Sequence, residues 1–144
     1  MILWRISNYA DLSGRGGLMA PGRWHEKGIS IVYCTDHPST ALLEILVQVD
    51  ADQLPEHFQL LKIFCPDDVQ SSPPAIDASE LPDTVKTRRA GMDWLRAAPS
   101  CLLKVPSAVM PEATNILINP QHPDAGRIII EKAVRYSFDR RFFR

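Results

Sequence analysis

The alternation of apolar and polar positions along the chain predicts mostly β-strands, with two helices inserted among them. Short runs rich in β-branched and aromatic residues indicate strands, because these side chains pack well on a pleated surface. Longer runs of good helix formers, one of them opening with aspartate and proline, predict helices over 36–49 and 84–99. Strand and helix do not alternate regularly, which favours an α+β fold built on a mostly antiparallel sheet. The predicted strands cover 2–7, 29–35, 58–66, 101–110, 114–120 and 127–138.

Two segments between these elements lack any periodic pattern. Residues 11–17 are rich in glycine and predict a loop. They lack the G-x-G-x-x-G spacing of a strand-to-helix nucleotide fingerprint, so a dinucleotide would have to bind in a non-Rossmann way. Residues 67–84 are acidic and proline-rich, which indicates a long surface loop. Since neither side of that loop would make a convincing domain alone, residues 1–144 are expected to form a single domain.

Glu44 is the one charged side chain in the apolar run of the first predicted helix. Thr40, Glu44 and Gln48 recur every four residues, so they share one stripe of that helix. Two interpretations stay open. The stripe is either the solvent face of a packed helix, or it faces a cleft in which a carboxylate is held ionised to act on a ligand.

Composition and charge narrow the function classes. The chain has 144 residues, 45% of them hydrophobic and 23% charged, with a formal net charge of −1. This balance is typical of a soluble globular protein and argues against an obligate nucleic-acid partner, which requires excess lysine and arginine. The sequence shows neither a signal-peptide pattern nor an apolar run long enough to span a bilayer, so we expect a cytoplasmic protein without membrane contact.

Cysteine and histidine spacing does not predict a metal site. The odd number and wide spacing of the cysteines favour reduced, packed thiols over a disulfide framework or a zinc site. They are Cys34, Cys65 and Cys101. The histidines lack metal-ligand spacing and are expected in loops or at the surface, with substrate contact an open alternative for the first of them. They are His25, His37, His57 and His122.

Two separated blocks carry a family resemblance. The runs "GRWHEKGISIVYCTDHPSTALLEILVQV" (22–49) and "VPSAVMPEATNILINPQHP" (105–123) resemble the RES domain family, toxins of bacterial toxin–antitoxin pairs named for arginine, glutamate and serine motifs. The likeness extends over nearly the whole chain and implies a fold similar to ADP-ribosyltransferases. Carried over position by position, the resemblance assigns the catalytic residues Arg23, Tyr33, Glu44 and Ser107, and the substrate-binding residues Arg5, Trp24 and Asn115.

The resemblance implies an enzyme that cleaves NAD between nicotinamide and ribose, with NAD as substrate and no separate cofactor. Glu44 would stabilise the positive charge that develops on the sugar as nicotinamide leaves. Arg23 would bind the pyrophosphate or Glu44 itself through its planar donors. Tyr33 would stack on the nicotinamide ring, and Ser107 would donate a hydrogen bond to the ribose or the amide.

The acceptor and the partners stay open at this stage. Water or phosphate as acceptor would deplete cellular NAD and arrest growth, whereas a protein side chain as acceptor would make the enzyme an ADP-ribosyltransferase. The family implies an Xre-type helix-turn-helix antitoxin, which would contact DNA in place of the toxin, and a possible homodimer within a larger complex. The alternatives are a non-catalytic interaction domain, docking through its acidic middle and basic end, and an RNA-acting toxin, which the near-neutral charge disfavours.

Overall fold

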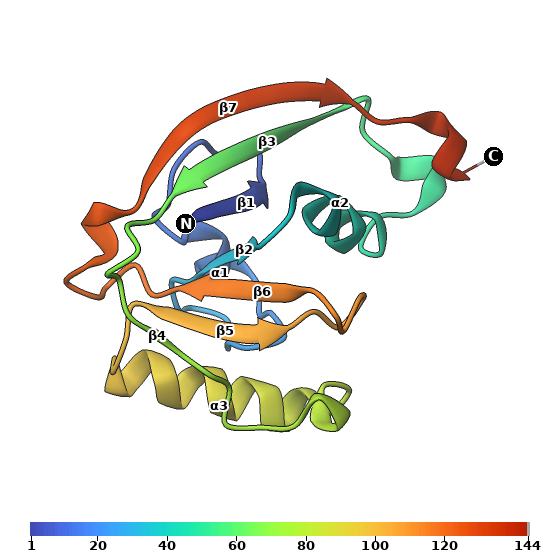
Figure 1. The fold of residues 1–144 in the computed structure, drawn as a ribbon. Helices are drawn as coiled ribbons and strands as arrows, with labels where there is room; N and C mark the ends of the chain where they lie inside the picture. The colour runs from blue at the N-terminus through green and yellow to red at the C-terminus, as the bar shows by residue number, and fades with distance from the viewer. Residues whose placement is uncertain (144) are drawn as a thin grey trace.

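A seven-stranded β-sheet organises the computed structural model, which describes residues 1–143 (Figure 1). The strand order is β4-β5-β6-β2-β1-β3-β7, and every neighbouring pair is antiparallel except β4 and β5. The predicted α+β class with a mostly antiparallel sheet is therefore confirmed. The strands are β1 (Ile2–Ile6), β2 (Val32–Thr35), β3 (His57–Phe64), β4 (Ser71–Ser72), β5 (Leu102–Pro106), β6 (Thr114–Ile118) and β7 (Ile129–Ser137).

Both predicted helices form, as α2 (Pro38–Leu46) and α3 (Thr84–Ala97). A short third helix, α1 (Arg15–Met19), lies in the glycine-rich segment that was predicted to be a loop. Gly14 precedes it with φ 74°, and a Cβ there would lie 2.6 Å from the Ile31 backbone nitrogen. The glycine allows a turn and a close backbone approach that no pattern in the sequence reports. Among the described residues, no helix has both the length and the apolar character needed to cross a membrane.

Several strands are shorter than predicted because local turns end them. β2 begins at Val32, later than the predicted start at 29, and β5 ends at Pro106, where the chain turns through residues 107–113 toward β6. The predicted long loop at 67–84 holds two short elements, β4 and a 3-10 helix at Ala78–Glu80. β4 pairs with β5 in parallel over two residues, too short a match for a sequence pattern to reveal.

The strands β5 and β6 carry apolar side chains on both faces, so they separate two hydrophobic clusters. Ile116 and Ile118 of β6 pack with Leu3, Leu61 and other residues of the sheet on one side. Leu117, between them, points to the other side, as the alternation of a strand requires. There α3 covers the sheet, as the ribbon shows (Figure 1). This second cluster contains Trp24, Ile31, Leu81, Trp94, Leu103, Val105 and Leu117.

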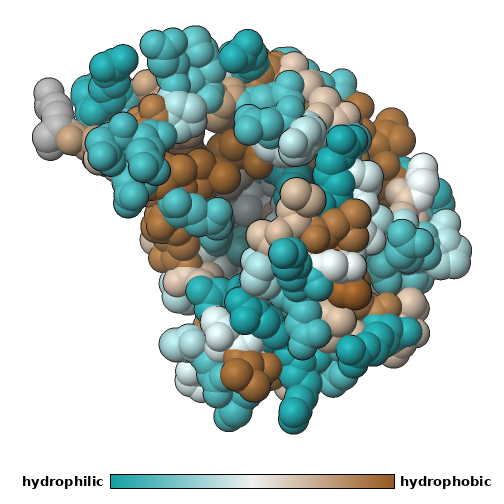
Figure 2. Space-filling model, turned by 180° about the vertical axis from the view of Figure 1, so that it is seen from behind, coloured by the Kyte–Doolittle hydropathy of each residue, from teal (hydrophilic) through white to brown (hydrophobic). Residues whose placement is uncertain are grey.

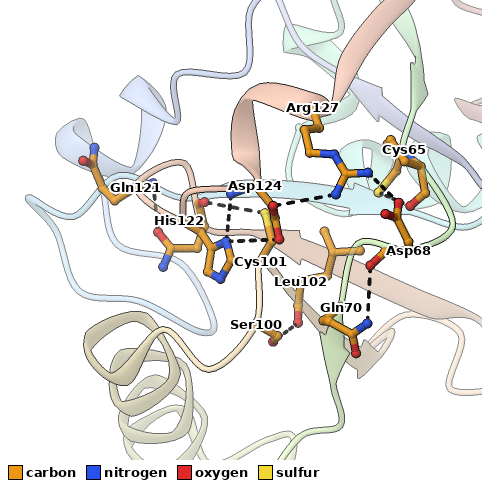
Figure 3. A network of polar contacts seen from close by, with 12 residues as sticks. Cys65, Asp68, Gln70, Ser100, Cys101, Leu102, Gln121, His122, Asp124 and Arg127 are labelled. Atoms are coloured by element: carbon orange, nitrogen blue, oxygen red, sulfur yellow. Dashed lines mark hydrogen bonds and ion pairs between the residues drawn. The ribbon is translucent and has the colours of Figure 1, made fainter.

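A polar network fastens the β4 segment to the turn before β7 (Figure 3). Arg127 donates to Asp68 at 2.6 Å and lies 3.7 Å from Asp124, which precedes it by three residues in the same turn. His122 accepts a hydrogen bond from the Asp124 backbone N–H at 3.0 Å. These contacts hold the acidic segment in place, although their exposure limits the stability that each contributes.

Gly91 is a point of close contact in α3. An ideal Cβ at Gly91 would lie 1.8 Å from the carbonyl oxygen of Trp24. The absence of a side chain therefore lets the helix approach the backbone of the segment before β2. Because that segment carries Arg23 and His25, this contact also helps to set the position of these two residues.

We predict that Gly91→Ala lowers the free energy of unfolding by about 1–3 kcal/mol, because the new methyl group must displace the Trp24 backbone. Gly126→Ala is the matched control, since a Cβ at Gly126 meets no atom within 4 Å. Urea denaturation of both variants tests this. Equal stability of the two variants would show that the helix and the segment are not in tight contact.

Candidate active site

A cleft of about 610 Å³ opens between α2, β1, β2 and the segment 16–25. Its size is within the range of small-molecule sites. The reverse face of the molecule is hollowed near its middle, with hydrophobic and hydrophilic side chains around the hollow (Figure 2). Every predicted site residue except Ser107 lines the cleft. The polar and charged lining includes Arg5, Arg23, His25, Tyr33, Glu44 and Asn115.

The helix α2 carries Glu44 into this cleft. His37 caps the helix by accepting a hydrogen bond from the Ser39 backbone N–H, and Pro38 occupies its first turn. The stripe predicted from the sequence runs from buried Thr40 through half-buried Glu44 to exposed Gln48 at the cleft. Of the two interpretations of this stripe, the structure therefore favours the one in which Glu44 faces a cleft.

One oxygen of Glu44 is fixed by two donors. Ser107 Oγ donates to Glu44 Oε1 at 2.7 Å, and Asn115 Nδ2 donates to the same atom at 2.9 Å. Among residues 1–143, no group donates to Oε2, so this oxygen remains free to accept a hydrogen bond from a ligand. Within the same part of the chain, Asn115 Oδ1 is a buried acceptor without a partner. An orphaned acceptor at a cleft wall is a position where a donor from water or ligand is expected.

Ser107 lies behind Glu44 and outside the cleft. Its side chain is 0% exposed, and its Oγ also accepts hydrogen bonds from the backbone N–H groups of Val109 and Met110. The hydroxyl proton is already donated to Glu44, so the predicted direct hydrogen bond from Ser107 to the substrate is not supported. Ser107 instead closes the turn after β5 and orients the carboxylate.

Two arginines give the cleft a positive wall. Arg5 in β1 donates from Nη1 to the Tyr33 carbonyl oxygen at 2.8 Å, and Arg23 donates from Nη1 to the Leu81 carbonyl oxygen at 2.5 Å. Within the described chain, neither guanidinium pairs with Glu44, which disfavours the alternative in which Arg23 binds that carboxylate. Each arginine keeps further donors that suit the oxygens of a phosphate.

Tyr33 in β2 shares its hydroxyl with His25. The Tyr33 Oη atom lies 2.7 Å from His25 Nδ1, and the Trp24 backbone N–H donates to it at 3.2 Å. Burial raises the pKa of Tyr33 well above its usual value, so the phenol stays neutral. His25 was expected in a loop or at the surface, and it lies in a loop but is buried, with only 3% exposed. Burial lowers the pKa of His25 below its usual value, with the charge of Arg88 acting in the same direction, and this favours the neutral imidazole.

Trp24 belongs mainly to the hydrophobic core. Its side chain is 2% exposed and packs in the second hydrophobic cluster with Trp94 and Leu117. Trp24 is also among the residues that line the cleft, so most of it supports the wall and only a small part can reach a ligand. The substrate contact predicted for Trp24 stays a prediction.

The helix α3 supports the segment that carries Arg23, although the contacting residues are 64 and 66 positions apart in the sequence. Arg88 donates from Nε to the Gly22 carbonyl oxygen at 2.8 Å, and Thr87 Oγ1 donates to the Arg23 carbonyl oxygen at 2.5 Å. These contacts fix the backbone on both sides of the Arg23 side chain. Sequence reasoning missed both residues, because their function depends on tertiary packing alone.

We predict that Ser107→Ala lowers the free energy of unfolding by about 1–3 kcal/mol, since it leaves two backbone N–H groups without their acceptor. Ser39→Ala, at an exposed position of α2, is the control and should change stability little. Urea denaturation measures both. A loss no larger than that of the control would mean that the turn does not depend on the serine hydroxyl.

A pH-dependent stability follows from buried, neutral His25. Its pKa is depressed in the folded state, so the unfolded chain binds the proton more readily, and stability falls as the pH decreases below about 6.5. We predict a shallower fall for His25→Asn than for the unaltered protein between about pH 8 and about pH 5. Denaturant unfolding at several pH values measures the slope. Identical slopes would show that His25 accepts a proton equally well in both states.

Comparison with known proteins identifies the family of this chain. The RES domain model matches residues 2–139. "Toxin Res" of Pseudomonas putida is 47% identical over 128 residues, which is 87% of this chain and 88% of that protein. The "Prs ADP-ribosylating toxin" of Sphingobium sp. is 37% identical over 154 residues, covering 98% of this chain and 96% of that protein.

A solved structure supports the fold. The crystal structure of the M. tuberculosis MbcT-MbcA toxin–antitoxin complex contains a similar chain, with a TM-score of 0.75 and 16% identity, over 94% of this chain and 84% of that one. At this identity the likeness concerns the fold alone. The family match over nearly the whole sequence, together with the two relatives above, is sufficient for an assignment: the chain belongs to the RES domain family.

Proposed function

We propose that this chain is the toxin of a bacterial toxin–antitoxin pair and that its cleft cleaves NAD at the bond between nicotinamide and ribose. The toxin assignment rests on the family and on two relatives that are named toxins. The similarity to each covers most of both chains. The proposed reaction is argued from the residues that line the cleft. The observation that carries it is Glu44, which lines the cleft and whose Oε1 has two donors, while Oε2 has no donor among residues 1–143.

The fixed carboxylate of Glu44 suits the charge that this reaction creates. When the positively charged nicotinamide leaves as a neutral base, the ribose gains oxocarbenium character. A carboxylate oriented toward the ribose stabilises that cation more than the ground state, which lowers the barrier. Hydrogen bonds to the sugar hydroxyls that strengthen in the transition state add to the effect, as in glycoside hydrolysis. Because Ser107 and Asn115 orient the carboxylate before the substrate binds, little reorganisation is needed during the reaction.

The rest of the cleft suits the other parts of a dinucleotide. Arg5 and Arg23 line the cleft and offer guanidinium donors for the diphosphate. Tyr33 offers an aromatic ring for stacking against nicotinamide. Asn115 Oδ1, a buried acceptor without a partner among the described residues, suits a hydroxyl or amide donor of the ligand. No separate cofactor is needed for bond cleavage by this route.

The acceptor of the ADP-ribosyl group distinguishes two forms of the proposal. Water or phosphate would give NAD depletion, which is our first candidate. Transfer to a protein side chain is the second candidate, and the name of the Sphingobium relative, an ADP-ribosylating toxin, favours it. Both forms begin with the same bond cleavage and make the same demands on Glu44.

An antitoxin partner follows from the toxin assignment. The solved M. tuberculosis neighbour is a toxin–antitoxin complex, which supports the proposal of a cognate antitoxin for this chain. We propose an antitoxin of the Xre helix-turn-helix type and a cytoplasmic location. The homodimer stays a prediction.

We predict that purified protein releases nicotinamide from NAD and that Glu44→Gln lowers the rate by about 100-fold or more, because the neutral amide cannot stabilise the sugar cation. Glu56→Gln, an exposed position outside this cleft, should keep the rate of the unaltered protein. Chromatographic quantification of nicotinamide gives the rates, and circular dichroism checks folding. An active Glu44→Gln variant would contradict the assigned role.

The second product identifies the acceptor. Mass spectrometry of the reaction distinguishes ADP-ribose, its 1-phosphate and an ADP-ribosylated protein. Absence of nicotinamide release with water, phosphate and cell proteins all supplied would favour the non-catalytic interaction domain instead.

A further inference from the structure

We propose that His25 is a positioning residue for NAD cleavage, which holds the Tyr33 hydroxyl so that Tyr33 presents its ring, and not its hydroxyl, to the substrate. This inference rests on the proposed function and adds to it a residue that the family motifs do not assign. It also defines what Tyr33 contributes. The argument depends on the hydrogen bonds of His25, the saturation of the Tyr33 hydroxyl and the space around both.

The partners of His25 determine which ring nitrogen carries the proton. Nε2 lies 3.0 Å from the Ala20 carbonyl oxygen, which can only accept a hydrogen bond. A neutral imidazole that donates from Nε2 has an unprotonated Nδ1. Nδ1 therefore accepts the hydrogen bond from Tyr33 Oη at 2.7 Å. In this tautomer, His25 links the Ala20 carbonyl to the phenol through one rigid ring.

The Tyr33 hydroxyl has no proton left for the substrate. Its hydrogen is donated to His25, and one of its lone pairs accepts the Trp24 backbone N–H at 3.2 Å. Tyr33 therefore cannot act as a general acid toward the leaving group while these bonds persist. What remains available at the cleft is the aromatic ring of Tyr33, which is the part needed for stacking.

The space around the hydroxyl is closed as well. A Cβ at Gly22 would lie 2.4 Å from Tyr33 Oη and 2.9 Å from His25 Nδ1. The Gly22 backbone therefore contacts both groups directly and leaves no room there for a side chain. The Arg88 side chain holds the Gly22 carbonyl oxygen at 2.8 Å, so this packing is fixed from α3.

A matched pair of variants tests the proposal. Asn at position 25 has its amide oxygen as many bonds from Cα as Nδ1 of histidine, so His25→Asn keeps an acceptor near Tyr33. His25→Gln extends further, toward the position of Nε2, and leaves the phenol without its acceptor. We expect His25→Gln to lower kcat for nicotinamide release by about 10- to 100-fold, and His25→Asn to keep it within about fivefold.

The same substitutions in a Tyr33→Phe background isolate the hydrogen bond. Because Y33F removes the same hydrogen bond from the side of the phenol, it should lower kcat about as much as His25→Gln does, by about 10- to 100-fold, while Y33A, which also removes the ring, should lose more. His25→Gln should cost no more than about threefold in kcat when it is added to Y33F, since no hydroxyl remains to be held. Circular dichroism and thermal unfolding confirm that each protein is folded.

Three results would overturn the proposal. Equal losses for His25→Gln and His25→Asn would show that the acceptor near Tyr33 is irrelevant. An equal loss from His25→Gln with and without Y33F would show that His25 acts independently of the hydroxyl. A loss of more than about 100-fold in Y33F would give the hydroxyl a direct part in the reaction. Failure of the unaltered protein to release nicotinamide would instead contradict the proposed function, and the role of His25 would fall with it.

Discussion

The hydrogen bonds from Ser107 and Asn115 to Glu44 Oε1 are the interaction on which the rest of the site depends. They come from the turn after β5 and from β6, whereas the carboxylate comes from α2, so three separate parts of the chain meet at one oxygen. A lone carboxylate in a partly apolar cleft would rotate toward bulk water. Two donors on one oxygen restrict that rotation and leave the other oxygen for a ligand. The charge is thereby fixed before a substrate arrives.

The opposite wall of the cleft is held by α3, which does not line it. Its residues Thr87, Arg88 and Gly91 contact the backbone of 22–24, and that segment in turn supports His25 and the Tyr33 ring. The hydrophobic cluster between α3 and the strands β5 and β6 therefore does more than stabilise the fold. It sets the position of the arginine and aromatic side chains relative to Glu44.

Much of this molecule could be predicted from its sequence. Hydrophobic patterns identified both longer helices and six of the strands, because each of these elements has an apolar face of sufficient length. The family motifs identified Arg23, Tyr33, Glu44 and Asn115, and all four line one cleft in the structure.

Features that depend on tertiary contacts were not predictable in this way. His25 was expected in a loop or at the surface, and its contacts with Tyr33 and the Ala20 carbonyl satisfy both ring nitrogens in a buried loop. The prediction of substrate contact for Ser107 is not supported, because neither a motif nor a spacing distinguishes a residue in a cleft from one just behind it. The contact between Gly91 and Trp24 joins segments far apart in the chain, so no local pattern predicts it.

The most direct test of the central claim is a crystal structure of the inactive Glu44→Gln variant with NAD bound. Our account predicts that the ribose attached to nicotinamide lies within hydrogen-bonding distance of the side chain at position 44, with the diphosphate near Arg5 or Arg23. NAD bound outside the cleft, or a position-44 side chain turned to bulk solvent in the complex, would contradict it.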